Sequence, residues 1–227
     1  MFDGTVPHRS SSAVKFGEMG ASWQPRVQRG IFCLACKRLS DVILSIFTLI
    51  LLAPAFGLIA LAIILDSPGP VLFRQRRTGF KGQVFTIYKF RTMHVADPDT
   101  EVRHASRDDV RVTRLGRFLR ETSLDELPQL LNIIRGDMAI VGPRPHAVEH
   151  DRMYAVLLPH YAERFAVRPG LTGLAQVQGL RGEVRGISCM SRRVECDILY
   201  AQHWSFPGDL SIMARTVPLL LARVNAH

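Results

Sequence analysis

The feature that most constrains this chain is an uncharged apolar run from Val42 to Leu65, bounded by Asp41 and Asp66. As one helix it would be about 36 Å long at about 1.5 Å per residue, and the hydrocarbon core of a bilayer is about 30 Å thick. A buried helix of a soluble protein remains an alternative, although such helices are usually shorter. A cleaved signal peptide is excluded, because the run begins about forty residues into the chain and is too long. The run therefore indicates a membrane segment.

A proline near the middle of the run argues against a straight crossing. Pro54 lacks a backbone N–H and clashes with the preceding turn, so we expect the helix to bend or break there. Basic residues flank the run on both sides, and the positive-inside bias cannot satisfy both flanks of a single span. These residues are Arg26, Arg29, Lys37, Arg38, Arg74, Arg76, Arg77 and Lys81. A re-entrant hairpin that enters and leaves on one face is favoured, with a kinked span as the alternative.

The chain divides into three parts around this run. Residues 1–36 mix Ser, Gly, Arg and Pro without apolar periodicity, which predicts a flexible basic tail. Residues 37–66 hold the re-entrant membrane helix, and residues 67–227 are expected to form the catalytic domain. Within that domain, Val71–Phe73 and Val84–Tyr88 predict a strand pair around a Gly-containing turn. Prolines and glycines divide the rest into short elements, so the expected fold class is α+β, a small membrane-associated globular domain.

Helices are predicted in three further stretches of that domain. Arginines recur at every third residue from Arg111 to Arg120, and apolar residues occupy the other faces. Ile198–Phe206 and Leu210–Val224 combine aromatic and aliphatic residues with few charges, which is typical of amphipathic interfacial helices and also of ordinary packed ones. The polar stretch from 94 to 109 is expected to be an exposed loop.

Composition narrows the class of partner and of chemistry. The chain has 29 Lys and Arg against 20 Asp and Glu, a net charge of +9, which predicts an anionic partner: nucleic acid, membrane surface or phosphorylated substrate. Nucleic acid is disfavoured, because the basic stretches lack interleaved aromatic residues and any binding motif. The four cysteines, at 33, 36, 189 and 196, lack a partner His for a zinc site and are expected to be free thiols. Zinc-hydrolase, serine-hydrolase and nucleoside-triphosphate motifs are absent from the sequence.

The segment from Arg117 to Asp137 is the one that suggests chemistry. Ser123 and Glu126 have capping-box spacing, which predicts a helix with Asp125 and Glu126 in its first turn. On spacing alone, a well-capped structural helix explains this pattern. The nearby Gly-Pro-Arg-Pro at 142–145 and the Arg-rich helix add guanidinium groups that match phosphate oxygens, and a divalent ion would offset the charge repulsion. One carboxylate could then attack phosphorus as a nucleophile.

Seven motifs occur in the order that is typical of one family. They are Lys37–Asp41, Ser67–Gln75, Tyr88–Met93, Thr122–Leu130, Arg135–Met138, Val141–Pro145 and Arg168–Gln176. In these motifs the chain resembles the bacterial sugar transferase family, the monotopic phosphoglycosyl transferases, in their short catalytic-core form. The resemblance implies transfer of a hexose 1-phosphate from a UDP-sugar to undecaprenyl (polyprenyl) phosphate with release of UMP, which initiates exopolysaccharide or another surface glycan. His146–Val148 and Arg181–Glu183 are similar to members that transfer glucose 1-phosphate, with galactose 1-phosphate as the alternative.

The resemblance also implies roles for individual residues. Asp125 would be the nucleophile that forms a phosphosugar–aspartate intermediate, and Asp125 and Glu126 would hold the cofactor Mg²⁺. The positions implied to bind substrate or phosphate are Lys89, Arg91, Arg120, Arg144 and Asp197. Pro54 matches the break in the family's re-entrant helix, where Ala53 replaces the usual Ser.

The resemblance further implies a location and partners. The chain is expected at the bacterial inner (cytoplasmic) membrane, with the catalytic domain on the cytoplasmic face, in contact with membrane lipid, the UDP-sugar donor and the polyprenyl phosphate acceptor. A homodimer stays open, and no nucleic acid is expected. A catalytically silent membrane scaffold of the same fold is the main alternative to an enzyme.

Overall fold

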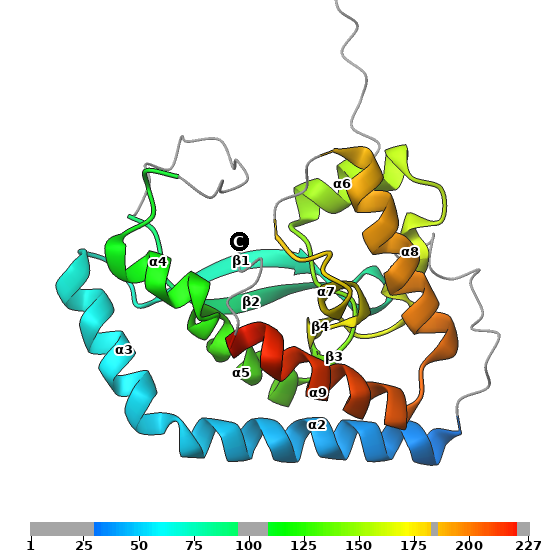
Figure 1. The fold of residues 1–227 in the computed structure, drawn as a ribbon, viewed down its shortest axis with the longest axis horizontal. Coiled ribbons are helices and arrows are strands. Elements are labelled where there is room, and N and C mark those ends of the chain that lie inside the picture. The colour runs from blue at the N-terminus through cyan, green and yellow to red at the C-terminus, as the bar shows by residue number, and fades with distance from the viewer. Residues whose placement is uncertain (1–29, 95–108, 183–185, 222–227) are drawn as a thin grey trace, which may run out of the picture.

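Two helices joined at a sharp bend form the base of the molecule. The computed structural model describes residues 30–94, 109–182 and 186–221. In it, α2 (Ile31–Leu51) runs along the base and α3 (Ala53–Asp66) rises from its end at a bend of 63° (Figure 1). Pro54 lies in the first turn of α3, so the predicted break is confirmed. Residues 31–36, which were expected in the tail, are helical.

The apolar side chains of this helix pair are largely uncovered. Among the described helices, none alone has both the length and the apolar composition of a membrane crossing, whereas the bent pair has them together. The large apolar side chains exposed on the pair are Phe32, Leu34, Leu39, Ile43, Leu44, Ile46, Phe47, Ile50, Leu51, Leu58, Leu61, Ile64 and Leu65. Such a continuous apolar surface is typical of a region that meets lipid or another protein.

A β-hairpin follows the helix pair directly. β1 (Leu72–Thr78) and β2 (Val84–Phe90) pair antiparallel around the 3₁₀ turn η1 (Phe80–Gly82), which confirms the predicted strand pair and extends both strands. Side chains alternate between the faces of the hairpin. Ile87 is buried against α5, and Lys89, two residues on, projects from the same face.

Short elements then build the mixed domain above α2. In chain order they are α4 (Arg114–Glu121), η2 (Leu124–Gln129), α5 (Leu130–Arg135), β3 (Ala139–Val141), α6 (Val148–Leu157), η3 (Tyr161–Ala166), β4 (Gly170–Thr172), α7 (Leu174–Val177), α8 (Ile187–His203) and α9 (Phe206–Leu221). β3 and β4 pair in parallel. The α+β class is therefore confirmed, and the polar loop predicted at 94–109 lies almost wholly outside the described residues.

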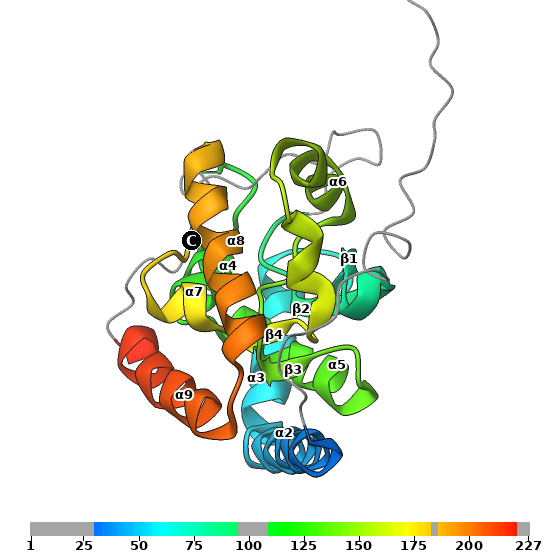
Figure 2. The same ribbon diagram turned by 90° about the vertical axis from the view of Figure 1, so that its right-hand side faces the viewer.

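Polar contacts fasten α2 to this domain. Figure 2 looks along α2 and shows α9 on one side of it and α5 on the other. Lys37 of α2 forms a 2.5 Å ion pair with the buried Asp209 of α9, which also accepts a hydrogen bond from Tyr200 at 2.9 Å. Arg38 donates to the carbonyl oxygens of Ile133 and Ile134, where α5 ends. The basic motif before the apolar run thus attaches the helix to the domain.

Candidate active site

Two adjacent carboxylates, Asp125 and Glu126, lie buried in the 3₁₀ helix η2, each 7% exposed. The capping box predicted here is wrong. Ser123 adopts a left-handed conformation with φ 59°, and its N–H donates to the carbonyl of Arg120 rather than to Glu126. Its hydroxyl accepts a 2.6 Å hydrogen bond from Arg181. In a capping box the Ser123 N–H would donate to the Glu126 side chain. Here this N–H bonds to the end of α4, and the Glu126 carboxylate is therefore available for other partners.

A buried asparagine sets η2 and α5 against the hairpin. Asn132 accepts a hydrogen bond from the Tyr88 N–H at 3.1 Å and donates to the Thr86 carbonyl at 2.7 Å, as a neighbouring strand would. This contact brings Lys89 of β2 beside both carboxylates. The Lys89 Nζ lies 2.9 Å from Glu126 Oε1 and 3.8 Å from Asp125 Oδ2.

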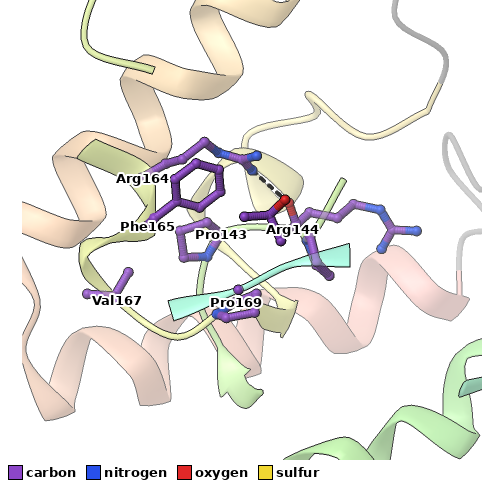
Figure 3. Close-up of a pocket in the computed structure, with 9 residues that line it drawn as sticks. Pro143, Arg144, Arg164, Phe165, Val167 and Pro169 are labelled. Carbon is purple, nitrogen blue, oxygen red and sulfur yellow. Dashed lines mark hydrogen bonds between the residues drawn. The ribbon is translucent and has the colours of Figure 1, made fainter. Parts of the chain in front are cut away.

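Arg144 reaches Glu126 from the segment after β3. The backbone there is tightly packed, because a Cβ at Gly170 would lie 2.1 Å from the Gly142 nitrogen. The Arg144 guanidinium contacts both oxygens of Glu126, with Nη1 donating to Oε2 at 3.0 Å and Nη2 donating to Oε1. Arg164 donates to the Arg144 carbonyl at 2.6 Å, and Figure 3 shows the Arg144 guanidinium pointing away from Phe165. A bidentate, charge-assisted pair of this kind fixes both partners.

The two carboxylates differ in their electrostatic surroundings. Burial raises the pKa of Glu126, but the cations Arg144 and Lys89 outweigh it and hold this pKa well below its usual range. Burial raises the pKa of Asp125, and Lys89 at 3.8 Å opposes the rise only in part. Within the described part of the chain no hydrogen bond reaches the Asp125 carboxylate. Glu126 is thus a fixed anion, and Asp125 keeps lone pairs available for chemistry.

The structure brings a third predicted arginine to the same place. Arg120 of α4 is one of the cations that lower the pKa of Asp125, and its Nε donates to the Thr92 hydroxyl at 2.9 Å. Lys89, Arg120 and Arg144 therefore surround the two carboxylates. Arg181 adds a fourth cation, since it lowers the pKa of Glu126. The sequence singled out Arg181 only through its resemblance to glucose 1-phosphate transferring members.

Two other predicted substrate-binding residues make their contacts elsewhere. Arg91 donates to the carbonyl oxygens of Pro68 at 2.5 Å and Ser67 at 2.6 Å, where α3 ends, so it ties the helix pair to β2. Asp197 of α8 forms a 2.8 Å ion pair with the buried Arg164, and so acts on Arg144 indirectly, through the hydrogen bond from Arg164 to the Arg144 carbonyl. Sequence reasoning missed Arg164, because a single arginine before the Arg-Pro-Gly motif cannot be distinguished from a surface one.

A small pocket lies behind Arg144, away from the carboxylates. Figure 3 shows its lining, which consists of Thr78, Gly79, Pro143, Arg144, Pro145, Arg164, Phe165, Val167 and Pro169. Lys89, Asp125 and Glu126 do not contribute to it. The pocket therefore belongs to the packing around the Pro-Arg-Pro segment. The chemistry is assigned to the cluster of Asp125, Glu126 and Lys89 on the guanidinium side of Arg144.

The donor set at the carboxylates is compatible with Mg²⁺. No group of three or more His, Cys, Asp or Glu side chains that could enclose a metal occurs among the described residues. Mg²⁺ is commonly held by only one or two carboxylates, with substrate phosphates and water as the other ligands. Asp125 and Glu126 fit this requirement, and Asp125 accepts no competing hydrogen bond within the described residues.

The fold and the carboxylate–arginine site agree with a known family. The chain belongs to the bacterial sugar transferases, whose family model matches residues 32–223.

Enzymes of this family from several bacteria are similar to the chain over most of its length. It is 54% identical over 191 residues to the UDP-glucose:undecaprenyl-phosphate glucose-1-phosphate transferase of Caulobacter vibrioides, which covers 84% of this chain and 72% of that protein. The identity is 48% over 181 residues to the Escherichia coli protein of the same name, covering 80% of this chain and 39% of that protein. It is 43% over 194 residues to the exopolysaccharide production protein PSS of Rhizobium leguminosarum, covering 84% and 97%. The chain thus spans well under half of the E. coli relative.

Proposed function

We propose that this chain is an enzyme that transfers glucose 1-phosphate from UDP-glucose to undecaprenyl phosphate and releases UMP. The observation that carries the proposal is the contrast between Asp125, buried without a hydrogen bond from the described chain, and Glu126, fixed by Lys89 and Arg144. The names of the relatives from C. vibrioides and E. coli support glucose as the sugar. The name of the R. leguminosarum relative supports a role in exopolysaccharide biosynthesis.

In the first half of the reaction, an Asp125 oxygen attacks the phosphorus that carries the hexose. The bond from this phosphorus to the bridging oxygen breaks, and UMP leaves with the electron pair. Lys89 and Arg144 bind the charge that develops on the phosphate oxygens, and Arg120 adds a further cation beside Asp125. Mg²⁺, when held by Asp125 and Glu126 together with the diphosphate, supplies additional neutralisation of charge.

In the second half, a phosphate oxygen of the acceptor attacks the same phosphorus. The bond to Asp125 breaks, the carboxylate is restored and the product is undecaprenyl diphosphate glucose. Both halves use the same cations, because the charge develops at the same phosphorus. The buried position of Asp125 excludes water, which would otherwise hydrolyse the intermediate.

The acceptor also accounts for the uncovered apolar surface of α2 and α3. A helix pair bent by 63° with basic residues on both flanks is compatible with a re-entrant hairpin. In the proposed topology this hairpin enters the inner membrane from the cytoplasmic face, and the carboxylates lie on that face within reach of a lipid phosphate. The exposed Leu210, Val217 and Leu220 of α9 fit an interfacial helix beside it.

The decisive experiment separates the two halves. Purified protein is incubated with UDP-glucose and Mg²⁺ without acceptor, and UMP and the intact protein mass are measured. We expect about one UMP per protein and a mass increase of one phosphohexose, both of which disappear in Asp125→Asn and on removal of the metal with EDTA. Glu195→Gln, which changes an exposed carboxylate on α8, should behave as wild type.

Each other outcome points to a different mechanism. Release of UMP only when acceptor is present, with no adduct, would replace the two-step mechanism by direct transfer. A preference for UDP-galactose over UDP-glucose would overturn the choice of sugar. Silence with every UDP-sugar, with and without acceptor, would favour a membrane scaffold of the same fold.

A further inference from the structure

Behind the carboxylate site, a buried polar network holds the ring of His146. The Arg164 Nη1 donates to His146 Nδ1 at 2.8 Å, and the Tyr161 hydroxyl lies 2.9 Å from the same nitrogen. The Tyr161 hydroxyl donates its proton to Asp151 at 2.7 Å. Arg164 is fixed in turn by its 2.8 Å ion pair with Asp197. The ring therefore has one orientation, set by side chains that are themselves buried.

These contacts determine which ring nitrogen of His146 carries the proton. An arginine only donates hydrogen bonds, so Nδ1 must accept with its lone pair and Nε2 must carry the hydrogen. Burial, followed by the positive charges of Arg164 and Arg77, holds the pKa of His146 well below its usual range, which agrees with a neutral ring. No hydrogen bond to Nε2 occurs within the described residues. His146 thus offers a neutral N–H donor.

The network connects His146 to Arg144, one of the cations proposed to bind the diphosphate. His146 follows Arg144 by two residues, and Arg164 donates both to His146 Nδ1 at 2.8 Å and to the Arg144 carbonyl at 2.6 Å. Arg193 also acts on His146, and it donates to the Gly182 carbonyl at 2.6 Å, next to Arg181. The diphosphate already has four cations at hand, whereas a neutral N–H suits an uncharged hydroxyl group.

We propose that His146 is a specificity-determining residue whose Nε2–H donates a hydrogen bond to a hydroxyl group of the hexose in the UDP-sugar donor. This inference rests on the proposed function and adds the part of the site that recognises the sugar. Arg164 is the positioning residue of this contact, because it fixes the ring and the Arg144 backbone together.

The test combines a change in the protein with a change in the sugar. Asn and Gln differ in reach, so His146→Asn keeps an acceptor for Arg164 but removes the N–H at the Nε2 position, whereas His146→Gln restores an N–H there. The donors are UDP-glucose and UDP-deoxyglucoses that each lack a different hydroxyl group. We expect His146→Asn to lower kcat/KM for UDP-glucose by about tenfold, and His146→Gln to recover most of it. His160→Asn is the matched control, since His160 is exposed and left-handed, a conformation that Asn tolerates.

The deoxy donors provide the readout that a structural role would not give. For one deoxy donor, kcat/KM with wild type should be about tenfold lower than kcat/KM for UDP-glucose. With His146→Asn, kcat/KM for this donor should not fall further, because the missing hydroxyl and the missing N–H belong to the same hydrogen bond. An equal loss in His146→Asn for every donor would overturn the inference while leaving the proposed function intact. A wild-type protein that turns over no UDP-sugar would instead contradict the proposed function itself.

Discussion

At the scale of single residues, charge partners give neighbouring groups different chemistry. Asp125 and Glu126 are adjacent and equally buried, yet Lys89 and Arg144 form hydrogen bonds with Glu126, whereas the nearest cation to Asp125 among the described residues is Lys89 at 3.8 Å. His146, two residues after the same arginine, is kept neutral by burial and then by surrounding positive charge, which both lower its pKa. Each of these side chains is specified by partners that come from other elements of the chain.

The neutral His146 predicts a dependence of stability on pH. Its pKa in the folded state lies well below 6.5, and the unfolded chain has the ordinary value. Below about pH 6.5 the unfolded state therefore binds a proton that the folded state does not bind. The free energy of unfolding then falls by up to about 1.4 kcal/mol for each unit by which the pH decreases. Between about pH 7.5 and pH 5.5, the melting temperature of His146→Gln should therefore fall less than that of wild type. His160→Asn should show the same fall in stability as wild type, and an identical fall in all three proteins would contradict a neutral His146.

The sequence could identify these residues only in part. Asp125, Glu126 and Arg144 belong to motifs that resemble a family, and the structure brings them together with Lys89. Arg91 belongs to a motif as well, but its guanidinium binds the carbonyl oxygens at the end of α3. A motif shows that a residue is required and does not show whether substrate or backbone requires it.

At the scale of elements, the break between α2 and α3 depends on one missing backbone donor. Pro54 cannot donate to the carbonyl one turn earlier, and it lies in the first turn of α3, where the absence of an N–H is tolerated. The Leu52 N–H still bonds to the Thr48 carbonyl at 2.9 Å, and the Phe56 N–H to the Leu52 carbonyl at 2.9 Å. The bend is thus confined to a single joint and was predictable from the proline alone.

Substitution of this proline should change the topology of the helix pair. In one straight helix through residues 31–66, Pro54 would be an interior proline, which costs about 3 kcal/mol. Pro54→Ala restores the backbone donor and removes this cost, so a straighter helix that can cross the bilayer becomes accessible. We expect an N-terminal tag, protected from outside in wild-type cells, to become accessible to protease from outside in part of the Pro54→Ala molecules. Pro70→Ala, at an exposed turn beyond α3, is the control and should keep the tag protected. If the tag of Pro54→Ala stays as protected from protease as in wild type, the flanking basic residues set the topology without the proline.

At the scale of the whole molecule, long-range contacts decide what the sequence leaves open. The predicted strand pair and the predicted break of the apolar helix at Pro54 are local patterns, and both were confirmed. The partners of Glu126 could not be foreseen, because Arg144 and Lys89 reach its carboxylate from elements remote in sequence. The parallel contact of β3 and β4 has the same origin, since Gly142 and Gly170 can meet only after the chain has folded.

The attachment of α2 to the rest of the domain converges on one buried carboxylate. Asp209 is 3% exposed and accepts from Lys37 of α2 at 2.5 Å, from Tyr200 at 2.9 Å and from Trp204 at 2.9 Å. Asp209→Ala would remove the nearest carboxylate from Lys37, which keeps only Asp41 at 3.6 Å as an anion among the described residues, and one hydrogen bond each from Tyr200 and Trp204. Loss of one member of a buried ion pair costs about 3 kcal/mol or more. We therefore expect the melting temperature in detergent to fall by roughly 6–12 °C, with a smaller fall of roughly 2–4 °C in Trp204→Phe, which removes one neutral bond.

The same substitution should affect the acceptor more than the donor. Within the described part of the chain, Asp209 has no hydrogen bond or ion pair to the carboxylate site, but it helps to fix the domain to α2, and in the proposed re-entrant topology this contact would set the height of Asp125 above the lipid. Below its melting temperature, Asp209→Ala should still release one UMP per protein from UDP-glucose without acceptor, and should transfer the sugar more slowly to undecaprenyl phosphate in vesicles than to the same acceptor in detergent. Asp66→Ala, which removes an exposed carboxylate at the end of α3, should change neither rate. Equal slowing of both half-reactions would show that Asp209 stabilises the domain without setting its position on the membrane.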